Sequence, residues 1–276
     1  MIATTAFVSR LEEFDRVGST NDEVRSWLAE GIPEVCVAVA DEQTAGRGRN
    51  GRSWVAPAGA AILVSLGFRP AGLRPEHAWR LAASVSLAMA EAAEAQLGLA
   101  EGTIRLKWPN DLVALIPLAS PSARSAAPGP SEVRKLGGVL GEATGLGTSD
   151  PAVVVGIGLN AGWRPEAFPA GLEATMTSLQ ALAPQRLIDR AAILRAFLDR
   201  VEGRVAALRA GRFDGAAWEG RQVTTGRIVA IVTDAGVETV HARGVDVESG
   251  ALLLGDEGPP RALLVGHIRH VRLGAV

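Results

Sequence analysis

The sequence predicts an α+β fold, in which a mixed β-sheet is backed by helices and a small C-terminal β-barrel follows. Short apolar runs predict buried strands at 35–40, 61–68, 136–143 and 153–159. Apolar residues at helical spacing predict long helices at 76–98 and about 186–210. Beyond residue 220, short strands separated by tight turns predict the barrel. We therefore expect a domain at 1–220 and a second one at 221–276.

The composition excludes several classes of protein. With 276 residues, 47% of them hydrophobic, the chain is long enough for one large core and a small second domain. A net charge of −2 and a pI near 6.1 give no general attraction to nucleic acid or to an anionic membrane. Neither a signal sequence nor an apolar run of transmembrane length is evident, so we expect a cytoplasmic protein. The single Cys36 lies in an apolar run and is expected to be a buried, inert thiol.

The N-terminal half is expected to alternate helices and strands. Ser19 to Glu23 opens the first helix, where Thr20 and Glu23 fit a capping box. The helix at 76–98 offers five core candidates, which are Trp79, Leu81, Val85, Leu87 and Met89. A strand at 104–108 is ended by Pro109.

The next stretch, from 115 to 134, is rich in Pro, Ser and Ala and cannot build a core. We expect it to be a mobile surface excursion between two strands. After the helix at 186–210, a short helix is expected near 213–220. The C-terminal strands are expected at 227–233, 237–245, 251–254 and 262–272.

The most informative segment is the loop from Ala45 to Pro57, AGRGRNGRSWVAP. Its arginines, Arg47, Arg49 and Arg52, alternate with glycines and precede Trp54. Glycine allows close backbone approach, and arginine presents a planar fork of donors to a phosphate or carboxylate. The loop therefore suits an anion attached to a flat ring, such as a nucleotide. A solvated basic loop or an RNA-binding segment is the alternative, but the buried strands predicted on both sides favour a fixed site.

Four further segments carry polar groups that could join this loop. Asn110 and Asp111 follow a strand, where they could hold a metal or a substrate amine. Lys135 precedes two glycines, and Asn160 ends a strand of small residues. Ser19 to Asn21 place hydroxyl and amide groups at a helix N-terminus. Each segment alone is ordinary, but their order along one chain predicts a shared site.

That order identifies a family resemblance over nearly the whole chain. The motifs are GRGRNGRSW, KWPND, KLGGVLGE, GIGLN, TSL at 177–179, and ARGVD followed by GALLL. Together they resemble those of biotin–protein ligases, which attach biotin to biotin-dependent carboxylases. The resemblance implies the class II aminoacyl-tRNA synthetase-like fold of biotin and lipoate ligases, with an SH3-like C-terminal barrel. The family's STN motif corresponds to Ser19, Thr20 and Asn21, and its early position leads us to expect a short form without a DNA-binding domain. A monomer or a homodimer is expected.

The resemblance also implies roles for individual residues. Arg47, Lys135 and Asp111 would be catalytic, with Asp111 acting as a base or as a metal ligand. The residues implied for biotin are Ser19, Thr20, Asn21, Gln43, Arg47, Gly48, Arg49 and Lys135. Those implied for the nucleotide are Arg49, Arg52, Trp54, Asn110 and Asn160.

The implied reaction has two steps, with ATP and biotin as substrates and Mg²⁺ as the metal. Biotin first becomes biotinyl-5′-AMP, and the biotinyl group then moves to a lysine of a biotin carboxyl carrier domain. A lipoate–protein ligase shares this chemistry and is the nearest alternative. An RNA-binding protein and a non-enzymatic biotin binder are the others, and neither would exchange pyrophosphate into ATP.

Overall fold

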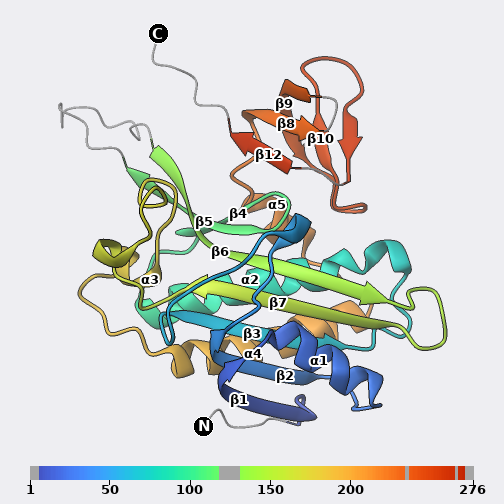
Figure 1. Ribbon diagram of the computed structural model, residues 1–276. Coiled ribbons are helices and arrows are strands. Elements are labelled where there is room, and N and C mark those ends of the chain that lie inside the picture. The colour runs from blue at the N-terminus through green and yellow to red at the C-terminus, as the bar shows by residue number, and fades with distance from the viewer. Residues whose placement is uncertain (1–5, 118–130, 234–235, 265–266, 271–276) are drawn as a thin grey trace.

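The computed structural model describes residues 6–117, 131–233, 236–264 and 267–270 and contains two β-sheets (Figure 1). The larger sheet has the strand order β1-β2-β3-β7-β6-β5-β4. Its strands are β1 (Arg10–Val17), β2 (Cys36–Gln43), β3 (Ala61–Phe68), β4 (Ile104–Lys107), β5 (Asp111–Pro117), β6 (Ser131–Thr144) and β7 (Ala152–Asn160). The pair β1–β2 is parallel and the other neighbours are antiparallel, so the predicted mixed sheet is confirmed.

Helices cover both faces of this sheet (Figure 1). Helix α1 (Thr20–Ala29) packs on β2, β3 and β7. On the other face lies α2 (Trp79–Leu97), and α4 (Arg190–Arg209) packs against α2. The shorter helices are α3 (Leu179–Leu182), α5 (Gly215–Gly220) and 3₁₀ turns at Arg49–Gly51, Pro75–His77 and Pro165–Ala167. None of the helices in the described ranges has the length and apolar content needed to cross a membrane.

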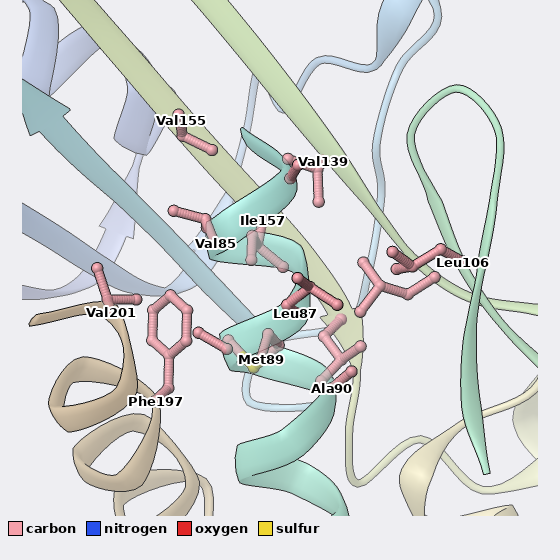
Figure 2. Packing of buried hydrophobic residues seen from close by; sticks show 14 of the residues in the cluster. Val85, Leu87, Met89, Ala90, Leu106, Val139, Val155, Ile157, Phe197 and Val201 are labelled. Atoms are coloured by element: carbon pink, nitrogen blue, oxygen red, sulfur yellow. The ribbon is translucent and has the colours of Figure 1, made fainter. Parts of the chain in front are cut away.

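The two faces of the sheet follow from the alternation of side chains along a strand. In β2, Cys36 and Ala38 pack with the apolar side of α1, whereas Val37 and Val39 belong to the larger core under α2. Figure 2 shows α2 between Val155 and Ile157 of the sheet and Phe197 of α4. Burial raises the pKa of the Cys36 thiol to about 11, in agreement with the inert cysteine expected from the sequence.

The C-terminal residues form a second sheet with the order β11-β10-β9-β8-β12. Its strands are β8 (Arg227–Thr233), β9 (Gly236–Val245), β10 (Leu252–Leu254), β11 (Arg261–Leu263) and β12 (His267–His270). The predicted barrel is not closed, because no pairing joins the outer strands β11 and β12 within the described ranges. The strand expected at 262–272 was wrong as a single element, since β11 and β12 lie at opposite edges of this sheet.

The turn that precedes β10 contacts the N-terminal part of the chain. The Trp108 indole donates a hydrogen bond to the Gly250 carbonyl (3.0 Å), and Arg80 donates to Glu248 (2.9 Å). Gly250 has φ +75°, and a Cβ at this position would lie 2.8 Å from the Trp79 ring. The turn is thus held against the start of α2 and the end of β4.

Three further expectations differ from the structure. The capping box is wrong, because Ser19 is the N-cap without a side-chain bond and the Thr20 hydroxyl donates to Gln43 instead. The excursion at 115–134 is too broad, since 115–117 pair with 131–133 as ends of β5 and β6. Residues 118–130 lie outside the described residues. Strand β1 was missed, because its five charged residues leave neither an apolar run nor a strict alternation.

Candidate active site

A cavity of about 150 Å³ opens on the α1 side of the large sheet. Its wall contains every residue that the motifs predicted for the site, with the exception of Asn160. These residues come from the N-terminus of α1, the end of β2, the basic loop, the β4–β5 turn, the start of β5 and the strand β6. Residues 156–158 of β7 complete the wall. The geometry therefore brings Arg47 and Trp54 of the basic loop together with Lys135 of β6, which is distant from that loop along the chain.

Register across the sheet explains the shape of this cavity. Lys107 of β4 lies opposite Asp111 of β5, which lies opposite Gly138 of β6. Gly138 in turn lies opposite Gly158 of β7. Directly opposed residues point to the same face of a sheet. One row therefore has two charged side chains at one end and two glycines, which leave a hollow, at the other.

Trp54 occupies the glycine end of this row. An ideal Cβ on Gly158 would overlap the indole, with Cζ2 only 2.8 Å away. A Cβ on Gly156, two residues earlier on the same strand, would likewise overlap the side chain of Asn21. These glycines are required because a methyl group would displace side chains that line the cavity.

Gly158→Ala is therefore expected to displace Trp54 and to weaken binding of the nucleotide that the sequence predicts for this site by about tenfold, since the loss of aromatic stacking on a base costs about 1–3 kcal/mol. Overpacking would also lower stability by about 1–3 kcal/mol. Equilibrium binding of ATP and thermal unfolding measure the two effects. Gly141→Ala on β6 is the control, because its Cβ would meet Ala82 at an ordinary 3.8 Å. Equal ATP binding by both variants would contradict this reading of Gly158.

A polar network fixes the N-terminus of α1 at the cavity. Gln43 Oε1 accepts hydrogen bonds from the Thr20 amide (2.8 Å) and hydroxyl (3.0 Å). The buried Ser65 hydroxyl lies 2.7 Å from Thr20 Oγ1 and 2.6 Å from Asn21 Oδ1. Asn21 Nδ2 donates to Glu142 Oε2 at 2.7 Å. The amides and hydroxyls expected from the STN motif are therefore held by partners from β2, β3 and β6.

Arg47 is bound to carboxylates at the rim of the cavity. Its guanidinium donates two hydrogen bonds of 2.7 Å to Asp22, and Glu142 lies 3.6 Å away. The hydrogen bond and charge of Arg47 lower the pKa of Asp22, and the bond to Asp22 raises the pKa of Arg47. Since these groups are partly exposed, an anionic ligand can compete with Asp22 for Arg47.

The electrostatics of the cavity favour an anion. Its wall contains the cations Arg47, Arg49, Arg52, Lys107 and Lys135, and Asp111 as the carboxylate. Lys135 Nζ lies 2.7 Å from Asp111 Oδ1 and 5.7 Å from the centre of the Trp54 ring. Burial lowers the pKa of Arg49, and burial also lowers the pKa of Lys107, where the Asp111 charge acts in the opposite direction. The local excess of positive charge contrasts with the net charge of −2 on the whole chain.

The two predicted asparagines use their side chains within the protein. Asn110 lines the cavity, but its Nδ2 donates to the Val139 carbonyl at 2.8 Å. Asn160 is buried outside the cavity wall and donates to the Thr177 carbonyl at 2.9 Å. Asn160 thus ties the end of β7 to the segment before α3.

Sequence reasoning missed four polar or charged contributors, which are Asp22, Ser65, Lys107 and Glu142. Glu142 stood within the KLGGVLGE motif without a role, and Asp22 was assigned only to the start of a helix. The signal for Lys107 was its place before the β4–β5 turn, which puts it opposite Asp111. Ser65 had no signal other than being a polar residue in an apolar strand.

Comparison with known proteins identifies the family. A sequence model described as the biotin/lipoate A/B protein ligase family matches residues 13–160. The chain belongs to this family. The biotin–[acetyl-CoA-carboxylase] ligase of Mycobacterium tuberculosis (strain ATCC 25618 / H37Rv) is 31% identical over 267 residues, or 95% of this chain and 90% of that protein. A ligase of the same name from Paracoccus denitrificans is 38% identical over 157 residues, covering 55% of each chain. The resemblance inferred from the motifs is confirmed.

Solved structures of the same family share the fold. The biotin protein ligase of Aquifex aeolicus in complex with biotin and ATP has a TM-score of 0.70 and 24% identity. The alignment covers 97% of this chain and 100% of that one. At this identity the likeness supports the fold alone, in which a mixed sheet is backed by helices.

Proposed function

We propose that this protein is a biotin–[acetyl-CoA-carboxylase] ligase, which converts biotin and ATP into biotinyl-5′-AMP and transfers biotin to a carrier lysine. The observation that supports this most directly is the convergence of Arg47, Trp54 and Lys135 on one cation-rich cavity. Ligases of this name among the relatives with 31% and 38% identity favour biotin as the acid.

In the first step, the biotin carboxylate approaches the α-phosphate, which is an encounter of like charges. Arg47, Arg49 and Lys135 would reduce this repulsion and stabilise the charge that develops at phosphorus. Arg47 would leave Asp22 and turn to the bound anion. The uncharged ureido ring of biotin needs hydrogen bonds, which Ser19, Thr20 and Gln43 would supply.

In the second step, a lysine of the carrier domain attacks the mixed anhydride. With a reference pKa near 10.4, only about one lysine in two thousand is neutral at pH 7. Asp111 would accept the proton from this lysine, since its carboxylate lies beside Lys135 at the cavity wall. The carrier is proposed to be the biotin carboxyl carrier domain of a biotin-dependent carboxylase.

Magnesium fits this site as a companion of the ATP phosphates. Within the described ranges no group of three or more His, Cys, Asp or Glu residues could hold a metal ion alone. Mg²⁺ commonly uses one or two carboxylates together with substrate phosphates, and Asp111 is the carboxylate that lines this cavity. When bound, the ion would neutralise phosphate charge.

We further propose that residues 1–220 form the catalytic domain and that 221–276 form an SH3-like domain. The small open sheet and its contact through Trp108 and Gly250 are consistent with that division. The turn at 246–250 would then brace the strand that leads into the cavity.

The deciding experiment is ATP–pyrophosphate exchange by the full chain with biotin, with lipoate and without an acid. We expect exchange with biotin and at least about 100-fold less with lipoate, because a site built for hydrogen-bonding groups rejects an analogue lacking them. Transfer of biotin to a purified carrier domain completes the test. Exchange driven by lipoate would favour the lipoate ligase, and exchange with neither acid would exclude adenylation.

A further inference from the structure

Lys135 faces the cavity because β6 is irregular at this point. An ideal Cβ on Gly138 would lie 3.6 Å from Lys135 Nζ, so the two residues face the same side of the sheet. Strict alternation would give that direction to Leu136 instead, but Leu136 is fully buried in the main core. The pairing with β5 shifts by one residue between Leu112 and Val113. Leu136 is therefore the extra residue of a β-bulge that turns Lys135 toward the cavity.

A bulge interrupts the regular ladder of hydrogen bonds, so the backbone around it needs other partners. The ladder between β6 and β7 ends at Gly137, and Lys135 lies beyond it. There the segment 175–177, which precedes α3, takes the place of β7. The Thr175 carbonyl accepts a hydrogen bond from the Lys135 amide (2.7 Å), and the Thr177 amide donates one to the Lys135 carbonyl (2.8 Å). Two bonds from one segment thus fix the backbone on both sides of the Lys135 side chain.

Asn160 holds this segment at the end of β7. Its Nδ2 donates a hydrogen bond to the Thr177 carbonyl at 2.9 Å, and the Thr177 amide is the group that binds Lys135. Asn160 and Thr177 are only 4% and 2% exposed, and a buried carbonyl that loses its partner is costly. Asn160 itself lies outside the cavity wall. Two hydrogen bonds through one intervening residue therefore connect the Asn160 side chain to the backbone of Lys135.

We propose that Asn160 is a positioning residue for Lys135. This inference rests on the proposed adenylation, in which the Lys135 ammonium faces the biotin carboxylate and the α-phosphate. Asn160 keeps the segment 175–177 in place, and the segment keeps the bulge that aims the ammonium. Such placement matters, since a displacement of about 1 Å can lower a rate about 100-fold. The nucleotide contact that the family motif implied for Asn160 predicts a different defect, which is a lower affinity for ATP.

The test is Asn160→Asp in the full chain, which keeps the size of the side chain and removes its N–H donor. We expect kcat for biotin-dependent ATP–pyrophosphate exchange to fall about 10–100-fold, because Lys135 loses its placement. KM for ATP and for biotin should change less than about threefold, as for an interaction that acts only in the transition state. Ser178→Ala is the matched control. The buried Ser178 hydroxyl donates to the Trp163 carbonyl and caps α3, so its loss should lower stability and leave kcat nearly unchanged.

A double variant tests whether Asn160 acts through Lys135. If it does, Asn160→Asp should lower the exchange rate less than about twofold when Lys135 has already been replaced by alanine, because the two effects are then not additive. The full loss in the Lys135→Ala background would overturn the proposal. A raised KM for ATP with an unchanged kcat in Asn160→Asp would also overturn it, in favour of a contact with the nucleotide.

The lysine content of the chain allows a direct measurement of the backbone. Lysine occurs only at positions 107 and 135, so a protein made with ¹⁵N-lysine gives one amide signal for each. Asn160→Asp should shift the signal of Lys135 and speed its hydrogen exchange about tenfold or more, with little change at Lys107. An unchanged Lys135 signal, or equal changes at both lysines, would contradict the proposed path. This result does not depend on catalysis, whereas a wild type without biotin-dependent exchange would refute the proposed function.

A second variant covers the case in which Asn160→Asp does not fold. Thr175 has an exposed side chain, and its hydroxyl (3.1 Å) and amide (2.9 Å) both donate to the Leu172 carbonyl. Thr175→Gly should therefore loosen the turn that presents the Thr175 carbonyl to Lys135 without unfolding the core. We expect kcat to fall about three- to tenfold with KM unchanged. A full exchange rate together with faster hydrogen exchange at Lys135 would show that its placement does not limit the reaction, and would overturn the proposal.

Discussion

Lys135→Ala is expected to lower the rate of biotin-dependent ATP–pyrophosphate exchange by about 10²–10³-fold, the range found when one preorganised donor is removed from a transition state. The ammonium lies 2.7 Å from Asp111 and faces the middle of the cavity. Its removal takes away the cation paired with Asp111, beside the approaching carboxylate and phosphate. The loss should therefore appear in the exchange rate more than in the affinity for either substrate.

Two variants separate this effect from a general disturbance of β6. Lys135→Arg keeps the charge but replaces a compact ammonium with a longer fork, so we expect an intermediate loss. Arg134→Ala removes the preceding cation, which pairs with Glu132 and does not line the cavity. It should retain at least half of the exchange rate. If Lys135→Ala retained a third of the wild-type rate with an unchanged unfolding temperature, the catalytic role would be wrong.

Sequence patterns predicted the strands whose apolar residues form a continuous or regularly alternating run. Strands β3 and β8 begin and end at the expected residues, because continuous apolar or alternating runs mark buried strands. Strand β1 and the ends of β5 and β6 were missed for the opposite reason. Strand β1 contains five charged residues, and the ends of β5 and β6 flank a segment rich in Pro, Ser and Ala, so that only pairing with a neighbouring strand reveals them.

Site residues that belong to a local sequence motif could be predicted. Residues that reach the site only through contacts between distant parts of the chain could not. The basic loop and Lys135 are recognisable from local sequence alone. Asp22 becomes important because α1 brings it to Arg47, and Lys107 because a hairpin register sets it opposite Asp111. Asn160 shows the converse, since its place in a motif does not reveal that its side chain binds Thr177.

Stability should depend strongly on the buried ion pair between Glu94 of α2 and Arg221, which precedes β8. Both of its N–O distances are 2.9 Å, and the side chains are only 5% and 8% exposed. Arg221 also donates to the Ile104 carbonyl (2.7 Å), and Glu94 accepts from the Ile104 amide (2.8 Å). Burial alone would lower the pKa of Arg221, but the bonds and charge of Glu94 raise it. The pair thus joins α2, β4 and the start of the C-terminal segment.

Glu94→Ala should lower the free energy of unfolding by about 3–5 kcal/mol, because it leaves a buried guanidinium without its counter-charge. For a chain of this size the unfolding temperature should fall by about 10 °C. Differential scanning calorimetry and urea unfolding measure both quantities. Glu238→Ala is the matched control, since its pair with Arg261 is more than half exposed and should contribute about 1 kcal/mol or less.

A double variant decides whether the cost comes from an unpaired charge or from lost packing. Glu94→Leu with Arg221→Met replaces both ions with apolar groups and should recover much of the stability lost in Glu94→Ala. Loss no greater than that of Glu238→Ala would contradict the importance of the buried pair. Because Ile104 begins the strand that ends at Lys107, folded Glu94→Ala should also bind ATP more weakly. The double variant should recover stability more fully than ATP affinity, since the bonds from both ions to Ile104 would still be missing.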